Sequence, residues 1–188
     1  MNKVKRFIVL FLIVFLLSSS LSFFLVTRPR SLKNFDGSLL KQTAVSELGN
    51  DGGEKYWKWY GFDKPTDWCA CFVSWCLDKC YDEPPKFASC SQFLRWFKEN
   101  RRLYSPNTDP MPGMIIFFDW ADNGQDGVSD HVGIVASVEN GTVHTIEGNS
   151  GDACRERSYS VGYYEILGYG VLQVGGETDN SNNETPTQ

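Results

Sequence analysis

The stretch WCACFVSWC, residues 68–76, decides the fold. Its apolar side chains recur at i, i+3, i+4 and i+7 from Cys69 onward, which is the spacing of a buried helix face, so a helix is predicted from Trp68 to Lys79. Thr66 or Asp67 is the expected N-cap. Cys69 then lies in the first helical turn, where unpaired backbone N–H groups and the helix dipole stabilise a thiolate.

Cys69 by itself allows two interpretations. A thiolate at a helix start is a nucleophile, and the same N–H groups can bind an oxyanion. A buried helix cysteine with no chemical role is also common, because cysteine is among the residue types most often found in cores. The nucleophile reading therefore needs a base elsewhere in the chain.

His131 is the candidate base. It comes directly before a predicted strand, residues 132–139, and after a polar loop, so we expect it at the lip of a sheet. The dipeptide Asn140-Gly141 predicts a hairpin to a second strand, residues 142–147, which brings the far ends of both strands to one edge. Glu147 would then lie beside His131, fixing its tautomer and stabilising the imidazolium.

Two other residues compete for roles in this site. Asn149 could orient His131 through its side-chain oxygen in place of Glu147, and Glu147 could be only a solvated turn residue. His144 alternates with Glu147 along its strand, so its side chain is expected on the opposite face, away from the site.

The order of the predicted elements indicates an α+β fold, with helices first and strands after. Ser38 is the expected N-cap of a first helix, which Gly49 ends. We expect a linker over residues 27–37, a catalytic domain over residues 38–174 and a disordered tail over residues 175–188. The other predicted elements are helices 39–48 and 91–100 and strands 114–120 and 168–174.

The N-terminal segment indicates export. Residues 1–6 carry Lys3, Lys5 and Arg6, and residues 7–26 form an apolar stretch that as a helix spans about 30 Å, one hydrocarbon thickness. We expect a single-pass membrane anchor with residues 1–6 in the cytoplasm and the catalytic domain outside. The alternative is a signal peptide cleaved after Ser20, which would give a secreted protein.

Composition limits the partners and cofactors. The net charge of −5 argues against nucleic acid as a partner. The six cysteines include no Cys-x-x-Cys pair, so a structural zinc site is not expected, although a Cys80–Cys90 disulfide stays open. No cofactor is predicted. The loop with Asp119, Asp122, Asn123 and Asp126 could bind calcium, but a solvated hairpin is expected. The aromatic residues Tyr56, Trp57, Trp59, Tyr60 and Phe62 could line a groove, but core packing is expected.

Four motifs in order resemble the CHAP family of cysteine- and histidine-dependent amidohydrolases and peptidases, which is related to the NlpC/P60 proteins. They are WCACFVSWC at 68–76, PG at 112–113 before IIFF at 115–118, DHVGIV at 130–135 and IEGNS at 146–150. The resemblance covers residues 40–172. It implies a papain-like α+β fold, with Cys69 as nucleophile, His131 as base, Glu147 as the group that orients His131, and Asn149 as an auxiliary polar group.

The resemblance also implies the substrate, the peptide part of peptidoglycan. The expected activity is that of an endopeptidase or an N-acetylmuramoyl-L-alanine amidase; the alternatives are an inactive, membrane-tethered wall-binding module and an amide hydrolase of a small metabolite.

Two positions depart from the family pattern. Met114 replaces the acid of a Pro-Gly-Asp motif, and Asp63 stands where papain-like enzymes have a glutamine that donates to the oxyanion, which an ionised carboxylate cannot do.

Overall fold

The computed structural model describes residues 32, 34–120 and 125–172. The chain divides into two compact units, residues 1–31 and 32–188, and the description concerns the second alone. The predicted cytoplasmic residues 1–6, the anchor or signal peptide 7–26 and the tail 175–188 lie outside the described residues. Within those residues, no helix has the length and apolar character needed to cross a membrane.

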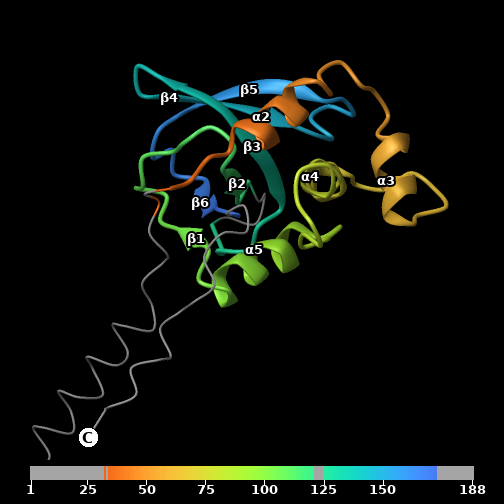
Figure 1. Ribbon diagram of the computed structural model, residues 1–188, viewed down its shortest axis with the longest axis horizontal. Coiled ribbons are helices and arrows are strands. Elements are labelled where there is room, and N and C mark those ends of the chain that lie inside the picture. The colour runs from red at the N-terminus through yellow and green to blue at the C-terminus, as the bar shows by residue number, and fades with distance from the viewer. Residues whose placement is uncertain (1–31, 33, 121–124, 173–188) are drawn as a thin grey trace, which may run out of the picture. The chain divides into compact units, whose positions relative to one another are not determined.

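The core of the domain is a six-stranded sheet in which all neighbouring strands are antiparallel (Figure 1). The strand order is β1-β6-β2-β3-β4-β5. The strands are β1 Leu103–Tyr104, β2 Ile115–Phe118, β3 His131–Glu139, β4 Thr142–Glu147, β5 Arg155–Ser160 and β6 Ile166–Gly170. Helices before strands and an antiparallel sheet confirm the α+β prediction.

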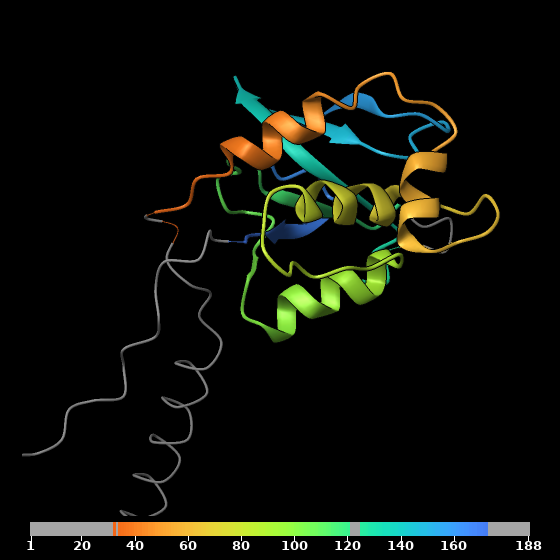
Figure 2. The same cartoon turned by 45° about the vertical axis from the view of Figure 1, so that its right-hand side comes forward.

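Helices α2, α4 and α5 lie over one face of this sheet (Figure 2). The helices are α2 Ser38–Val45, α3 Glu54–Tyr60, α4 Cys69–Asp78 and α5 Cys90–Glu99. Their buried side chains form one apolar cluster with alternate residues of β2, β3 and β4, such as Phe117, Ile134 and Ile146. Eight of the ten α4 residues are buried, so the helix that begins at Cys69 is the centre of this layer.

The predicted helices exist, but several of their ends were wrong. Gly37 is the N-cap of α2, and Ser38 is its first residue, whose N–H is held by Asp36 Oδ1 at 2.9 Å. Trp68, not Thr66 or Asp67, is the N-cap of α4. Ser89 caps α5 by accepting from the Gln92 N–H.

Three short elements were missed by the sequence analysis. Helix α3 has 7 residues, too few for a periodic pattern to be read, and β1 has 2. Strand β5 reads RERSYS and is largely exposed, so it lacks the apolar alternation that marks a strand. Of the five aromatic residues for which core packing was expected, Tyr56 and Trp57 are buried, Trp59 and Tyr60 are half-buried and Phe62 is exposed. Tyr56 stacks on Trp68, at the start of α4, with ring centroids 5.2 Å apart, so the prediction holds for the two buried residues.

The predicted Asn140-Gly141 hairpin is confirmed. Both residues have positive φ, 51° and 76°, as a two-residue turn of this kind requires. The register runs from Glu139↔Thr142 to Val138↔Val143, but it then shifts by one residue between Val135 and Ser137. This β-bulge changes which face of the sheet the earlier residues of β3 occupy.

The sheet is strongly curled. Phe118 of β2 and Tyr159 of β5 have ring centroids only 4.7 Å apart, although β3 and β4 lie between their strands. In a flat sheet three strand spacings would separate them by about 14 Å. The curl encloses a second apolar cluster on the face away from the helices, to which Phe118, Val135 and Val143 belong.

Candidate active site

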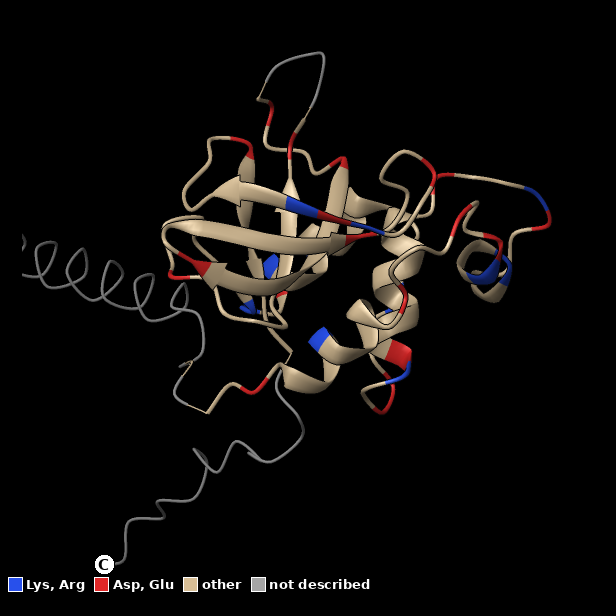
Figure 3. Ribbon diagram, turned by 90° about the horizontal axis from the view of Figure 1, so that it is seen from above, with Lys and Arg blue, Asp and Glu red and all other residues tan. Residues whose placement is uncertain are grey.

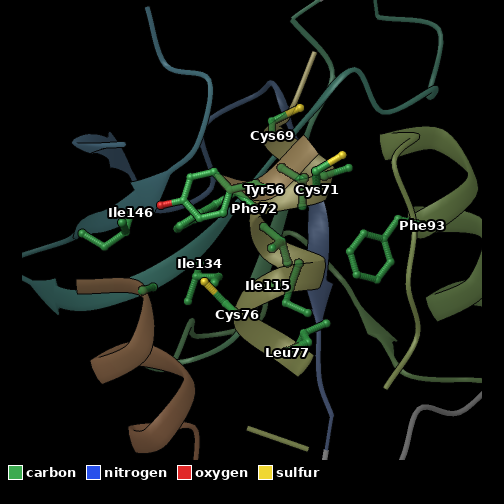
Figure 4. Packing of buried hydrophobic residues seen from close by; sticks show 14 of the residues in the cluster. Tyr56, Cys69, Cys71, Phe72, Cys76, Leu77, Phe93, Ile115, Ile134 and Ile146 are labelled. Atoms are coloured by element: carbon green, nitrogen blue, oxygen red, sulfur yellow. The ribbon is translucent and has the colours of Figure 1, made fainter. Parts of the chain in front are cut away.

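Cys69 begins helix α4, at the end of the central helix layer (Figure 4). Cys69 is only 5% exposed. Trp68 makes no side-chain cap hydrogen bond among the described residues, so the first N–H groups of α4 are not taken by a capping side chain. They can therefore serve a thiolate and an oxyanion, and the Ala70 N–H helps to lower the pKa of Cys69.

Two glycines let the chain approach this helix start. A Cβ on Gly53 would lie 2.3 Å from the Trp68 ring, and one on Gly148 would lie 2.5 Å from Phe72 Cβ. Any side chain at either position would push against α4. The glycine of the IEGNS motif thus brings the end of β4 against the catalytic helix.

His131 and Glu147 are paired where β3 begins and β4 ends. His131 Nε2 lies 3.0 Å from Glu147 Oε2, and both side chains are buried. The other ring nitrogen, Nδ1, is left for Cys69, whose hydrogen bonding and charge raise the pKa of His131. The structure therefore brings Cys69, His131 and Glu147 into one chain of contacts.

The β-bulge in β3 is what puts His131 on the side of Glu147. With the unshifted hairpin register, Glu147 would pair with Ile134, and His131 would face the opposite side of the sheet. The shift after Val135 moves the pairing by one residue, so Gly133 and His131 share the face of Glu147. A Cβ on Gly133 would lie 2.8 Å from Glu147 Cγ, so glycine at this position makes room for the carboxylate.

Glu147 is held by two hydroxyl donors that the sequence analysis missed. Thr145 Oγ1 donates to Glu147 Oε1 at 2.6 Å, and Tyr159 Oη donates to the same oxygen at 3.0 Å. Burial and the Glu147 charge raise the pKa of Tyr159, so it stays a donor. The buried carboxylate is thus satisfied on Oε1 while Oε2 is turned to His131.

Trp120 covers the imidazole. Its ring is stacked on that of His131, with centroids 4.1 Å apart and an interplanar angle of 17°. The Trp120 backbone is fixed by its own N–H, which donates to both carboxylate oxygens of Asp130 at 3.0 Å. The stack limits rotation of His131 and, because an aromatic face attracts cations, favours its protonated form.

The contacts at the site favour a thiolate–imidazolium pair. A hydrogen bond with Cys90, together with the hydrogen bond and charge of His131, outweighs burial and lowers the pKa of Cys69 to about 5. Burial disfavours a charged His131, but hydrogen bonds to Cys69 and Glu147 outweigh it and raise its pKa to about 9. Between these values both groups are charged, which is the state that thiol acyl transfer uses.

Asn149 is not brought to His131. It lies in a turn with φ of 59°, and its Nδ2 donates to Asp67 Oδ1 at 3.2 Å. Glu147, not Asn149, is the group that contacts the imidazole. The two departures from the family pattern also have clear places: Met114 is fully buried in the apolar core, and Asp63 is exposed in the segment before α4.

His144 lies away from the site, as strand parity predicts. Its Nδ1 is 2.9 Å from Ser158 Oγ and 3.5 Å from Glu156 Oε1, both on β5. His131 is therefore the histidine that contacts Cys69 and Glu147.

The structure bears on two alternatives raised by the sequence, the calcium loop and the Cys80–Cys90 disulfide. Among the described residues, no group of three or more His, Cys, Asp or Glu side chains could hold a metal ion, but Asp122 and Asn123 of the weighed calcium loop lie outside them. All six cysteines are free, so Cys80 and Cys90 form no disulfide.

Figure 3 shows Lys and Arg spread over separate elements, with Asp and Glu between them.

An α+β domain with a thiol at a helix start and a histidine–carboxylate pair at the sheet edge has the architecture of the papain-like hydrolases. Residues 59–149 match the CHAP domain family. This match confirms the resemblance found in the motifs of the chain. No curated protein matches the chain in sequence.

Two solved structures of Ly7917 agree with this fold. The crystal structure of Ly7917 with the hydrolyzing product of MDP matches with a TM-score of 0.50 at 13% identity, over 73% of this chain and 63% of that one. A second structure of Ly7917 matches with 0.50 at 14%, over 71% and 61%. A lipoprotein-like NLP/P60 family protein from Staphylococcus aureus subsp. aureus Mu50 has a TM-score of 0.43 at 16%, over 80% and 45%. The chain thus spans less than two thirds of each Ly7917 chain.

Proposed function

We propose that this protein is a peptidoglycan hydrolase that cleaves amide bonds of the wall peptide by a Cys-His-Glu thiol mechanism. The observation that carries the proposal is the contact chain from Cys69 through His131 to Glu147, at the start of a helix in a CHAP domain. The description of a Ly7917 structure, which holds the hydrolyzing product of MDP, supports a wall-derived substrate.

The proposed reaction is acyl transfer through a covalent intermediate. The Cys69 thiolate attacks the amide carbonyl, and backbone N–H groups at the start of α4 stabilise the oxyanion. His131 gives its proton to the leaving amine as the C–N bond breaks, leaving a thioester on Cys69. Neutral His131 then takes a proton from water, whose hydroxide attacks the thioester and releases the new carboxylate and the Cys69 thiolate.

The chemistry of the site favours amide over glycosidic bonds. Glycoside hydrolysis normally uses two carboxylates that flank an oxocarbenium-like transition state. Glu147 is the carboxylate that contacts the site's imidazole, and its oxygens are engaged by His131, Thr145 and Tyr159. An endopeptidase and an N-acetylmuramoyl-L-alanine amidase both fit this mechanism.

The test is to digest purified peptidoglycan and to label new amino groups and new reducing sugar ends. We expect new amino groups without new reducing ends, and the labelled residue identifies the amide that is cut. Cys69→Ala is the control and should release neither. New reducing ends without new amino groups would exclude the mechanism. No release by the wild-type protein would favour a binding module or a small-metabolite hydrolase.

We also propose that the catalytic domain acts outside the cell membrane. The support is the apolar stretch 7–26 preceded by basic residues. Membrane fractionation and N-terminal sequencing test this directly: retention of residues 7–26 in the membrane fraction indicates an anchor, and a soluble form that begins at Leu21 indicates a cleaved signal peptide.

A further inference from the structure

A second thiol lies in contact with the proposed nucleophile. Cys90 is the first residue of α5, it is 6% exposed, and its Sγ is 3.3 Å from Cys69 Sγ. The proposed hydrolysis does not use Cys90. Its place therefore needs a separate explanation.

The contact between the two sulfurs joins the first residues of helices α4 and α5. Residues 69 and 90 are separated by α4 and the loop with Pro84-Pro85, and each cysteine opens its own helix. A disulfide bond is about 2.05 Å long, so the two sulfurs must approach by roughly 1 Å to join. Among the cysteines of the described residues, Cys90 is the one whose sulfur is in hydrogen-bond contact with Cys69, whereas Cys80 contacts Thr43 and Cys154 contacts Tyr56.

The two thiols also have complementary reactivity. Cys69 is held as a thiolate by its neighbours, and a thiolate is the form that peroxides oxidise. The hydrogen bond to Cys69 and burial raise the pKa of Cys90, which keeps it a thiol. A reactive thiolate with a protonated thiol beside it is the arrangement of a peroxidatic and a resolving cysteine.

We propose that Cys69 and Cys90 form a reversible disulfide when a hydroperoxide oxidises the site. The Cys69 thiolate attacks the terminal OH oxygen of the hydroperoxide, breaking the O–O bond, and becomes a sulfenic acid. The leaving oxygen takes the proton of the His131 imidazolium, so the peroxide is reduced to water or an alcohol. The Cys90 sulfur then attacks the Cys69 sulfur, its proton leaves with the hydroxyl as water, and the S–S bond forms. Two thiols are thus oxidised for each hydroperoxide reduced.

This disulfide has two consequences for the enzyme. It covers the sulfur that the proposed function assigns as nucleophile, so the oxidised protein is inactive. It also protects that sulfur, because a sulfenic acid with no neighbouring thiol proceeds to sulfinic acid, which thiol reductants do not reverse. Reduction by a dithiol returns both thiols and the activity.

The experiment treats the reduced full-length protein with hydrogen peroxide and follows it by intact mass and peptide mapping. Cleavage at Lys79 and Lys86 separates the two cysteines, so a disulfide joins two peptides. We expect the wild-type protein to lose two hydrogen atoms and to yield the Cys69–Cys90 linked peptide. Dithiothreitol should restore its activity to the starting value.

Variants make the proposal specific. In Cys90→Ser and Cys90→Ala, Cys69 should gain oxygen atoms without a linked peptide, and dithiothreitol should restore less than about a tenth of each variant's own starting activity. Cys80→Ser, in which the substituted thiol contacts Thr43, should behave as wild type. A sulfinic Cys69 in the wild-type protein, or a link to another cysteine, would overturn the proposal. The mass readout is independent of wall hydrolysis, so failure of the proposed function would leave this test intact.

Discussion

Helix α4 gives the same side chain opposite chemistry at its first residue and further along its length. Cys69, Cys71 and Cys76 are all buried on one helix (Figure 4). The pKa of Cys69 is lowered to about 5, whereas burial raises that of Cys71 to about 12 and that of Cys76 well above its ordinary value. One cysteine is a thiolate at neutral pH and the others are apolar core residues.

Burial does not explain the difference, because all three residues are almost fully enclosed. Cys69 differs in its partners: the Cys90 thiol, the His131 imidazolium and the Ala70 N–H all stabilise its negative charge. Cys71 and Cys76 have mostly apolar surroundings and, for Cys71, the repelling charge of Cys69. The contacts that Cys69 makes, rather than residue type or burial, therefore lower the pKa of its thiol.

The strongest way to break the comparison is to remove each thiol in turn. Cys69→Ala should lower wall hydrolysis by about 10⁴-fold or more, because the covalent intermediate cannot form. Cys71→Ala should keep most of the activity. Rates of amino-group release, with melting temperatures to verify folding, measure both. Equal losses in the two variants would mean that the position of Cys69 is not special.

The next prediction extends the comparison to the partner of Cys69. His131→Gln should lower the rate by about 10² to 10⁴-fold, because the leaving amine loses its proton donor. His144→Gln is the matched control on β4 and should stay near the wild-type rate, since His144 contacts Ser158 and Glu156 instead. Loss of turnover in the His144 variant alone would refute the pairing.

The pH profile sharpens the comparison by reporting on the charged pair. kcat/KM should fall tenfold per pH unit below about 5, where Cys69 takes up a proton, and above about 9, where His131 loses the proton that the leaving amine needs. Glu147→Gln should move the upper limb down by about one unit, because the carboxylate's charge and hydrogen bond favour imidazolium. An unmoved upper limb in this variant would contradict the role of Glu147.

The smallest effect is expected at the far end of α4. Cys76→Ser places a hydroxyl in an apolar site and should lower the free energy of unfolding by about 1–3 kcal/mol while activity stays near wild type. Chemical denaturation measures the change. Cys80→Ser is the half-buried control and should cost less, because Thr43 contacts that side chain. A Cys76 variant that lost activity before stability would link this end of α4 to catalysis.

The local features of the fold were readable from the sequence. The i, i+3, i+4, i+7 spacing that begins at Cys69 predicted α4 to within one residue at each end, and Asn140-Gly141 predicted the hairpin and its turn. Both signals depend on neighbours a few residues apart, where periodicity and turn stereochemistry act. The same parity rule correctly separated His144 from Glu147.

Parity was not enough for His131. Counting along β3 from the turn would place His131 on the face opposite Glu147, and the β-bulge that reverses this has no strong mark in the sequence. The expectation that the two would meet came from the hairpin bringing both strand ends to one edge. The structure gives the missing step, a one-residue shift in pairing.

The sequence by itself predicted most of the helices and strands, the family resemblance and the candidate nucleophile and base, because short-range periodicity and motif order encode them. Only the tertiary structure decided which groups complete the site. Tyr159 contacts Glu147 from β5, a strand that lacks the usual alternation of apolar residues. Asn149 donates to Asp67, and Cys90 contacts Cys69 although 21 positions separate them in the chain. Such contacts depend on sheet curl and helix packing, which arise from the whole core at once and leave no local pattern.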